Sequence, residues 1–313
     1  MKYIKPKRLK RGDVIGIISP ASSVEDETLI KNGLRYVEGL GYRVELGKNV
    51  GKVKGYLAGT DEERVEDIHQ MFSDKNIRAI FCLRGGYGAF RLLDKINYQI
   101  IKKNPKIFVG FSEITSLQVA FLTKANLVTF SGPMIVSHFS NEINNFTEEN
   151  FWRLLTSKSK PKKMALSEEQ INSNVKCSKA SGRIIGGNLA VFSAMIGSGY
   201  LPPLKNHILL LEEISEPPYK IDRMLNQLRS HKVFKKLNGI ILGNFIDCEE
   251  TDKQKSSLTL EEVLDDYFSE LKIPVIRSFP YGHSKDILTL PIGISVSLNI
   301  KKKRIEFLEN TVR

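Results

Sequence analysis

The stretch KIFVGFSEITSLQVAF, residues 106–121, carries a serine at a position where a nucleophile could be held. An apolar strand pattern leads to Ser112 and a helical pattern follows directly, so the chain must turn sharply at this serine. Gly110 permits the close approach that such a turn demands, and the backbone N–H of Glu113 would face a developing oxyanion from the helix N-terminus. The pattern departs from the nucleophile elbow G-x-S-x-G at Ile114. Serine is also a favoured N-cap, so an ordinary helix cap is the alternative.

A second loop, FCLRGGYGAF at residues 81–90, also follows an apolar strand pattern and precedes a helical one. Its glycines, Gly85, Gly86 and Gly88, leave backbone N–H groups exposed, as phosphate cradles and oxyanion holes both require. No Gly-Lys-Ser/Thr follows, and the spacing is not G-x-G-x-x-G, so a nucleotide is disfavoured. The loop therefore indicates either an oxyanion hole or a tight strand-to-helix turn.

A serine nucleophile needs a base and a carboxylate that orients this base. Glu212 and Glu213 lie at the end of an apolar strand pattern beside the proline-stiffened segment SEPPYK. His283 lies in the loop YGHSKD, an exposed position typical of a general base. His138, in MIVSHFS, is the alternative base. The other three histidines lie in a charged helix, at the start of a strand and at the end of a helix: His69, His207 and His231.

The composition disfavours several other kinds of site. The 313 residues include three cysteines, Cys82, Cys177 and Cys248, with no close pair and no metal-type spacing, and the chain has no HExxH. Neither a disulfide framework nor a metal site is therefore expected. The net charge of +12 comes from lysines along the whole length, without interleaved aromatic residues, so nucleic acid is not an expected partner. The excess positive charge favours substrates that bear carboxylates.

The N-terminal segment MKYIKPKRLKRGDVIGIISP lacks the long apolar stretch and the small-residue cleavage site of a signal peptide. Its apolar run Val14–Ile18 is too short to cross a membrane, and no later run approaches the roughly 20 residues that a spanning helix needs. We therefore expect a cytoplasmic protein without a membrane partner.

Short β-branched runs alternate with helical periods in the first half of the chain. This alternation predicts an α/β fold whose parallel sheet is covered on both faces. Ligands of such sheets bind beyond the carboxyl ends of the strands. The strands are expected at Val14–Ile18, Arg78–Leu83, Lys106–Gly110 and Leu127–Phe130, and the helices at Glu25–Gly39, Glu62–Phe72, Gly88–Ile96 and Glu113–Ala125.

The pattern changes after Phe151. Residues 157–182 are polar and rich in Lys and Ser, which is typical of a linker. We therefore predict an N-terminal α/β domain at 1–156 with the candidate nucleophile, and a smaller mixed α/β domain at 183–313 with the candidate acid and base. In the second domain, strands are expected at His207–Leu211, Gly239–Phe245, SVSLNI and RIEFLE, and helices from Gly187, at Tyr219–Arg229 and at Leu260–Leu271.

Seven segments in this order resemble the LD-carboxypeptidases, serine peptidases that remove the terminal D-alanine from muropeptide tetrapeptides during cell-wall recycling. They span nearly the whole chain, and their number and order are far more specific than any one of them. The segments are KRGDVIGIISPASS, LRGGYGA, PKIFVGFSEIT, SGPM, IIGGNLAVF, LLLEEISEPPYKIDRML and FPYGHSKDILTLPIG.

The resemblance implies a flavodoxin-like or glutaminase-like N-terminal domain and a triad assembled across both domains. It implies Ser112 as the nucleophile, Glu212 as the triad acid and His283 as the general base. The oxyanion hole would be formed by the backbone N–H groups of Glu113 and of Gly86, or of the neighbouring glycine at 85. The implied substrate is a muropeptide or another small peptide, and neither a metal nor an organic cofactor is needed.

Two further residues are candidate ligands for substrate carboxylates. Arg84 and Asn188 lie at loop positions that would face the expected cleft, with turn packing or a helix cap as the alternative for each. A homodimer is an open alternative to a monomer.

Two positions depart from the family pattern. The residue after the nucleophile is usually Asp and here is Glu113, so that any side-chain role in holding the turn is open. The HGPM often seen after the following strand is here SGPM, with Ser131 in place of histidine.

Three alternatives to the cell-wall peptidase stay open. The family has a branch that cleaves microcin-like peptidyl nucleotides and gives self-immunity, although EPPYKIDRMLNQL resembles the cell-wall branch more closely. A non-catalytic protein could use the same cleft to bind an anionic peptide. A glutaminase-like amidotransferase would want a cysteine in place of Ser112.

Overall fold

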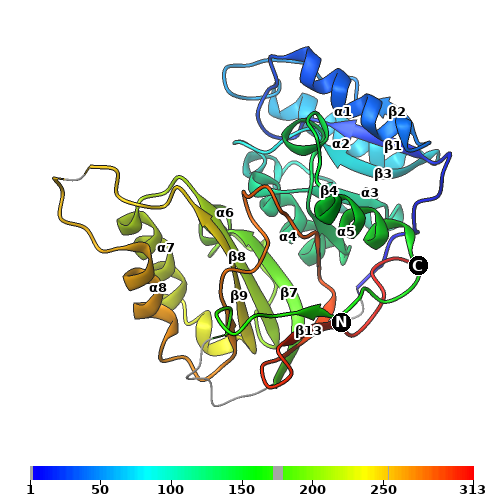
Figure 1. Cartoon of the computed structure of the whole chain (residues 1–313). Coiled ribbons are helices and arrows are strands. Elements are labelled where there is room, and N and C mark those ends of the chain that lie inside the picture. Colours follow the sequence, from blue (N-terminus) through cyan, green and yellow to red (C-terminus); the bar gives the residue numbers. More distant parts are fainter. Residues whose placement is uncertain (1–2, 172–178, 253) are drawn as a thin grey trace. The chain divides into compact units, whose positions relative to one another are not determined.

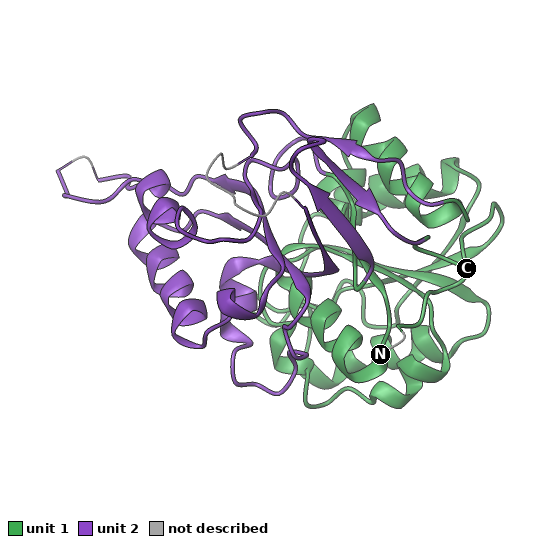
Figure 2. Cartoon of the chain, turned by 90° about the horizontal axis from the view of Figure 1, so that it is seen from below, with its two compact units in different colours: residues 1–159, 288–293, 310–313 green, residues 160–287, 294–309 purple. Residues whose placement is uncertain are grey.

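The chain folds into two compact units in the computed structural model, which describes residues 3–171, 179–252 and 254–313 (Figures 1 and 2). Figure 2 shows unit 1 in green and unit 2 in purple. Unit 1 comprises Met1–Ser159, Leu288–Gly293 and Asn310–Arg313, and unit 2 comprises Lys160–Ile287 and Ile294–Glu309.

Unit 1 is built on a six-stranded sheet in the order β11-β5-β4-β3-β1-β2 (Figure 1). Its strands are parallel except β11, which pairs antiparallel with β5. The carboxyl ends of the three central strands β1, β3 and β4 therefore lie at one edge of the sheet, where ligands of such sheets bind. The strands are β1 (Val14–Ile18), β2 (Arg43–Leu46), β3 (Ile77–Cys82), β4 (Ile107–Gly110), β5 (Thr129–Ser131) and β11 (Leu290–Ile292).

Helices cover this sheet on both faces. The α-helices are α1 (Glu27–Gly39), α2 (Asp61–Ser73), α3 (Tyr98–Lys103), α4 (Thr115–Ala125) and α5 (Asn145–Thr156). Shorter turns are the 3₁₀ segments η1 (Phe90–Leu92) and η2 (Ser112–Ile114) and the π-helical segment η3 (Ile135–Phe139).

The two faces follow from the alternation of side chains along the strands. On one face, Ile107 and Val109 of β4 join a buried cluster with Val37 of α1 and Phe151 of α5. Phe108 points to the opposite face, where its ring lies 6.2 Å from Phe72 of α2 and 4.9 Å from Phe121 of α4. Strands buried on both faces are continuously apolar, which explains why these runs were readable in the sequence.

Unit 2 contains a seven-stranded mixed sheet in the order β10-β9-β8-β7-β12-β13-β6. Strands β7 to β10 are parallel neighbours, whereas β12, β13 and β6 are added antiparallel. The strands are β6 (Met164–Ala165), β7 (Lys179–Asn188), β8 (His207–Ile214), β9 (Gly239–Ile246), β10 (Val275–Ile276), β12 (Ser295–Asn299) and β13 (Arg304–Phe307).

The α-helices of unit 2 have clear sequence causes. Proline occupies the first position of α7 (Pro218–Ser230), where its missing N–H has no helical partner to lose. A capping box of Thr259 and Glu262 starts α8 (Leu260–Phe268). Figure 1 shows α7 and α8 side by side. The third helix, α6 (Leu189–Ala194), begins directly after β7, and a 3₁₀ turn η4 covers Phe234–Lys236.

The predicted α/β class is confirmed: one unit has a parallel-rich sheet and the other a mixed sheet. The strand Val14–Ile18 has the predicted bounds, and the other three strands predicted in unit 1 are shifted by one or two residues at their ends. The elements without a counterpart among the expected ones are α3 and α5 and the strands β2, β6, β7, β10 and β11.

One predicted helix is wrong and another is displaced at its start. The helix at Gly88–Ile96 is only the short turn η1, because Gly88 has a φ of +104° and the N–H groups of residues 88–90 bind a side chain from another loop. The helix from Gly187 starts two residues later, because β7 continues to Asn188 and this residue caps α6.

Each of the two units is made of more than one segment of the chain, whereas the sequence predicts one domain before a linker and one after it. Residues 288–293 and 310–313 return to unit 1, where β11 adds to the edge of its sheet. The segment 157–182, predicted as a linker, contains β6 and the first residues of β7, and its residues 172–178 lie outside the described part of the chain.

In the described part of the chain, no helix combines the length and the apolar character that a membrane span requires. Cys82 and Cys248 are buried free thiols, and burial raises the pKa of both, that of Cys248 to about 11. Cys177 lies outside the described residues.

Gly110→Ala should lower the free energy of unfolding by about 1–3 kcal/mol, the usual cost of overpacking a close-packed site. A Cβ at Gly110 would lie 2.4 Å from Cγ2 of Ile114, so the turn after β4 would have to shift. Gly39→Ala, at the exposed end of α1 with no atom within 4 Å of the new Cβ, is the matched control and should not destabilise. Urea unfolding of both variants checks this, and equal unfolding free energies would contradict it.

Candidate active site

Ser112 lies in a strained turn at the carboxyl end of β4. Its φ is +61°, a left-handed conformation that costs a non-glycine residue on the order of 1 kcal/mol. It does not act as a helix cap, since it is the first residue of η2, and within the described residues its hydroxyl makes no hydrogen bond. The half-buried serine therefore has the backbone geometry of a nucleophile elbow rather than that of an N-cap.

Small and buried groups allow this turn. Gly110 permits Ile114 to fold back onto the strand, as expected from the sequence. The buried amide of Gln118 donates to the carbonyls of Gly110, at 3.1 Å, and of Phe130, at 2.7 Å, and so links the ends of β4 and β5. The turn is thereby held from the helix that follows it.

The glycine-rich loop after β3 packs directly against the elbow. A Cβ at Gly85 would lie 3.1 Å from Cβ of Ser112 and 3.5 Å from the backbone nitrogen of Glu113. Gly86 has a φ of +105° and a Cβ there would lie 2.3 Å from Oγ of Ser22. The same Ser22 hydroxyl accepts the N–H of Tyr87 at 3.0 Å. At Gly86 both the positive φ and the contact with Ser22 favour glycine, whereas a Cβ at Gly85 would require only a small shift of Ser112 or Phe111.

The carboxylate of Glu113 ties the elbow to this loop. One oxygen, Oε1, accepts the backbone N–H groups of Gly88 at 2.9 Å, Ala89 at 2.8 Å and Phe90 at 3.3 Å. Burial raises the pKa of Glu113, and the three N–H donors and the charge of Arg64 oppose that rise. The side chain whose role the sequence left open thus holds the turn.

A buried arginine fixes the other side of the loop. Arg64 of α2 donates through Nη1 to the carbonyls of Pro20, at 2.7 Å, and Gly88, at 2.9 Å, and through Nη2 to Asp61 at 2.6 Å. Its guanidinium is buried, and burial lowers its pKa. The loops after β1 and β3 are therefore both held by one side chain from α2.

In unit 2, His283 is paired with Glu212. Nδ1 of His283 lies 2.7 Å from Oε2 of Glu212, whose side chain is 0% exposed while that of the histidine is 21% exposed. An ionised carboxylate can only accept hydrogen bonds, so the proton of the neutral imidazole resides on Nδ1. Nε2 is then the ring nitrogen that can accept a proton, as a general base must.

Local backbone contacts place His283 beside this carboxylate. Gly282 has a φ of +130°, and a Cβ there would lie 3.3 Å from Cβ of Glu212. Asn244 of β9 donates its backbone N–H to the carbonyl of Tyr281 at 2.7 Å and its side-chain amide to Ser284 at 2.8 Å. The histidine loop is therefore held on both sides of residue 283.

The adjacent Glu213 has a different role. Its carboxylate accepts the side-chain amide of Asn188 at 2.7 Å and the backbone N–H groups of Ala190, at 2.7 Å, and Ile214, at 2.9 Å. Burial raises its pKa, and these donors oppose the rise. Successive residues of β8 point to opposite faces of the sheet, so only one glutamate faces the histidine. Both are buried, and β8 continues past them to Ile214.

The two candidate substrate ligands have structural contacts. The side chain of Asn188 accepts the N–H of Val191 at 3.1 Å and so caps α6, the alternative kept open for it. Arg84 donates to the carbonyl of Ser23 at 3.3 Å. Ser131, the departure from HGPM, is buried in β5 between Gly110 of β4 and Leu290 of β11.

The alternative base His138 belongs to η3 of unit 1. Its ring centroid lies 6.3 Å from that of Phe111, next to the elbow. Its Nδ1 accepts the backbone N–H of Met134 at 3.1 Å. The proton of the neutral ring is then on Nε2. Because this nitrogen already bears a proton, it cannot accept one as a general base must.

Among the residues that the structure describes, no three His, Cys, Asp or Glu side chains come together as metal ligands would. The described groups are of types that can transfer a proton, as the imidazole of His283 can, and attack a carbonyl, as a serine hydroxyl beside a glycine-rich loop can.

Comparison with known families identifies both halves of the chain. Residues 15–132 match the LD-carboxypeptidase N-terminal domain, and residues 181–298 match the LD-carboxypeptidase C-terminal domain. The chain belongs to the LD-carboxypeptidase family.

Individual LD-carboxypeptidase relatives cover almost the whole chain. A probable murein peptide carboxypeptidase of Bacillus subtilis is 36% identical over 301 residues, which are 96% of this chain and 92% of the relative. The microcin C7 self-immunity protein MccF of Escherichia coli is 30% identical over 95% of this chain and 94% of its own.

Solved structures agree with this assignment. A structure of MccF in complex with glutamyl sulfamoyl guanosine has a TM-score of 0.88, with 25% identity and 99% coverage of both chains. The muramoyltetrapeptide carboxypeptidase of Oxalobacter formigenes has a TM-score of 0.81, with 30% identity over 93% of this chain and 97% of that one. The chain is thus a hydrolase of the peptidase class.

Two residues that hold the loops around Ser112 have no role predicted from the sequence, Ser22 and Arg64. Ser22 lies in the segment ISPASS and Arg64 in a helical period, and neither position has a pattern that predicts these contacts. One weak pattern in the sequence indicates that Arg64 is buried: it is a charged residue next to Val65 on the side of α2 that faces the interior. Its carbonyl partners come from loops 44 and 24 residues away, which no local pattern reveals.

Glu113→Ala should lower the free energy of unfolding by about 3 kcal/mol, because three backbone N–H groups would lose their acceptor. Glu113→Gln should lose about 1 kcal/mol or less, since its amide oxygen can replace Oε1. The exposed Glu142→Ala is the matched control.

Urea unfolding and amide hydrogen exchange at residues 85–90 measure this. Faster exchange in Glu113→Ala alone is expected. Equal exchange in all three variants would show that the Glu113 carboxylate does not hold the glycine-rich loop.

Proposed function

We propose that this chain is a serine-type LD-carboxypeptidase that removes the terminal D-alanine from muropeptide tetrapeptides in cytoplasmic cell-wall recycling. The observation that carries the proposal is the pair of His283 and the fully buried Glu212 at 2.7 Å. A carboxylate beside Nδ1 keeps the proton of the neutral imidazole on that nitrogen, so that Nε2 can accept a proton as a general base. A histidine without a catalytic role does not need such a partner.

In the proposed mechanism, Ser112 of unit 1 and the Glu212–His283 pair of unit 2 act as one triad. His283 takes the proton of the Ser112 hydroxyl through Nε2 as the oxygen attacks the carbonyl before the D-residue. Glu212 stabilises the imidazolium that forms. His283 then gives the proton to the leaving amino group of D-alanine. In the second half of the reaction, His283 takes a proton from the water that attacks the acyl-enzyme and returns it to Oγ of Ser112.

The oxyanion of the tetrahedral intermediate would be held by backbone N–H groups of Glu113 and Gly86. The close packing of Gly85 against Ser112, and the bond from Glu113 to the next residues of the loop, support this assignment. Loss of one such donor costs on the order of 3 kcal/mol in comparable enzymes. The local strain at Ser112 supports a hydroxyl that is presented to a substrate rather than used within the fold.

The proposed substrate class rests on the relatives and on charge. One relative, 36% identical to this chain, is named for murein peptides, and one solved structure is named for muramoyltetrapeptides. A muropeptide tetrapeptide bears several carboxylates, which the net charge of +12 favours. A peptidyl nucleotide of the microcin type is the second candidate, because the MccF structure has the higher TM-score of the two solved structures described above.

Wild-type protein should release D-alanine from L-alanyl-D-glutamyl-diaminopimelyl-D-alanine, and Ser112→Ala should release none above background. Mass spectrometry of the products measures both. Ser73→Ala, an exposed serine at the end of α2, is the matched control and should retain wild-type activity.

The same experiment separates the two substrate classes. If wild type leaves the muropeptide intact but cleaves a glutamyl sulfamoyl adenosine in a Ser112-dependent way, the cell-wall assignment is wrong and the immunity branch takes its place. Equal turnover by wild type and Ser112→Ala would refute the serine mechanism itself.

His283→Ala should reduce kcat by at least a hundredfold, whereas His138→Ala should leave kcat within a few-fold of wild type. The reason is the tautomer of each ring. Nδ1 of His283 faces a carboxylate, which leaves Nε2 able to accept a proton, whereas Nδ1 of His138 accepts a backbone N–H, which leaves the proton on Nε2. Steady-state kinetics on the cleaved substrate compare the two variants. The opposite ranking would assign the base to His138.

A further inference from the structure

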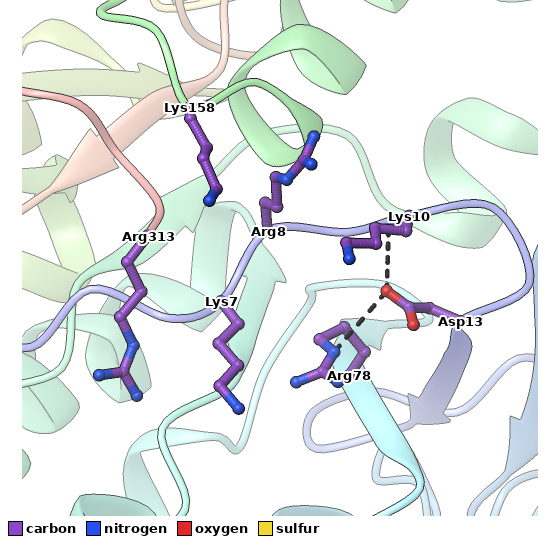
Figure 3. Close-up of a pocket in the computed structure, with 7 residues that line it drawn as sticks. All are labelled: Lys7, Arg8, Lys10, Asp13, Arg78, Lys158 and Arg313. Carbon is purple, nitrogen blue, oxygen red and sulfur yellow. Dashed lines mark hydrogen bonds and ion pairs between the residues drawn. The ribbon is translucent and has the colours of Figure 1, made fainter.

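A cationic basin lies on unit 1, at the end of the sheet opposite to Ser112. Its cavity volume is about 550 Å³, within the range of small-molecule sites. Figure 3 shows the ends of the Lys7 and Arg78 side chains directed toward the same space, whereas the Arg8 side chain points to the other side of the N-terminal segment. The lining residues are Lys7, Arg8, Lys10, Asp13, Arg78, Lys158 and Arg313.

Backbone contacts assemble the basin from segments far apart in the sequence. Arg8 donates its N–H to the carbonyl of Arg313 at 3.0 Å, and Arg313 donates its own to the carbonyl of Pro6 at 2.9 Å. The guanidinium of Arg8 donates to the carbonyl of Thr156 at 3.3 Å, near the end of α5. Lys158 follows two residues later. Backbone hydrogen bonds between distant segments therefore place these cationic side chains near one another.

The positive charge of the basin is poorly compensated. Six of the seven lining residues have cationic side chains, and Asp13 has the single acidic side chain among them; the main-chain carboxylate of Arg313, which accepts the N–H of Arg8, adds a second negative charge. Asp13 lies 3.7 Å from Nε of Arg78 and accepts the backbone N–H of Lys10. In the described part of the chain, the side-chain charges of Lys7, Lys10 and Lys158 have no carboxylate partner. Clustered like charges repel, so a bound anion would stabilise this arrangement.

The basin is separate from the candidate active site. Asp13 immediately precedes β1 and Arg78 is the second residue of β3, so both lie at the amino ends of parallel strands. Ser112 follows the carboxyl end of β4, which is parallel to β3. A strand of four or five residues, roughly 13–16 Å, therefore separates the two edges of the sheet.

We propose that this basin binds a small anion that carries several phosphate groups. One ion pair in water is weak, so a monovalent anion would gain little from exposed lysines, whereas a multivalent anion contacts several cations at once. Arginine forks match phosphate oxygens in a bidentate manner and lysine ammonium groups add point charges. A compact anion that binds near Lys7 and Lys158 would lie away from the carboxylate of Asp13 and would be repelled by it less.

Isothermal titration calorimetry of the full chain with sodium triphosphate tests this at 100 mM NaCl. We expect saturable binding with one site per chain, and affinity that falls as the salt concentration rises. Inorganic phosphate should bind at least tenfold more weakly than triphosphate. Citrate, with three carboxylates, should also bind more weakly, and equal affinity for citrate would overturn the assignment to phosphate groups.

Lys7→Gln/Lys158→Gln should weaken triphosphate binding at least tenfold. Both side chains are exposed, so this variant is expected to fold. Lys235→Gln/Lys236→Gln is the matched control: it removes the same charge from two exposed lysines of η4 that do not line the basin, and should change the affinity less than twofold.

Three results would overturn the proposal: no saturable binding, an equal loss of affinity in both double variants, or basin-dependent binding of a single-stranded oligonucleotide where triphosphate does not bind. The last result would assign the basin to a polymer. None of these measurements uses peptidase activity, so the test is independent of the proposed function.

Discussion

The buried carboxylate of Glu113 is the interaction on which the arrangement around Ser112 depends. A charge removed from water must be satisfied by donors, and Oε1 of Glu113 finds three of them in the backbone of residues 88–90. Because Glu113 is the neighbour of Ser112, this one contact fixes the elbow and the glycine-rich loop relative to each other. The strained φ of Ser112 can persist because its surroundings leave the turn few alternatives.

Unit 2 satisfies its buried charges in a comparable way. Glu213 takes the donors at the start of α6 and holds the end of β7 near β8, while Glu212, one residue earlier, accepts from the imidazole of His283. The alternation of a strand separates two chemically identical side chains into a structural one and one suited to orient a base. Such pairs are costly to break, since removal of either partner leaves a buried polar group without its contact.

The elements predicted correctly are those whose cause is local. The strand Val14–Ile18 and the helix near Pro218–Ser230 follow from continuous apolar runs, helical periodicity and a proline start. The helix predicted at Gly88–Ile96 failed because its first N–H groups bind a side chain that is more than twenty residues away in sequence. Likewise, the short π-helical segment Ile135–Phe139 was not predicted, because it has no periodicity that differs from a loop.

The sequence by itself determined the α/β class, the position of Ser112 between a strand and a helix, and the resemblance of the whole chain to one family. These depend on neighbouring residues and on ordered motifs, which are visible without a fold. The contact of Glu212 with His283, which the resemblance implied, is seen only in the tertiary structure, as are the ring nitrogens of His283 and His138 that face an acceptor or a donor and the groups that Glu113 binds. The tertiary structure also brought together the cations of the basin. The physical reason is that buried charged groups form hydrogen bonds with segments that are distant in the sequence, and local patterns do not show which segments will be in contact.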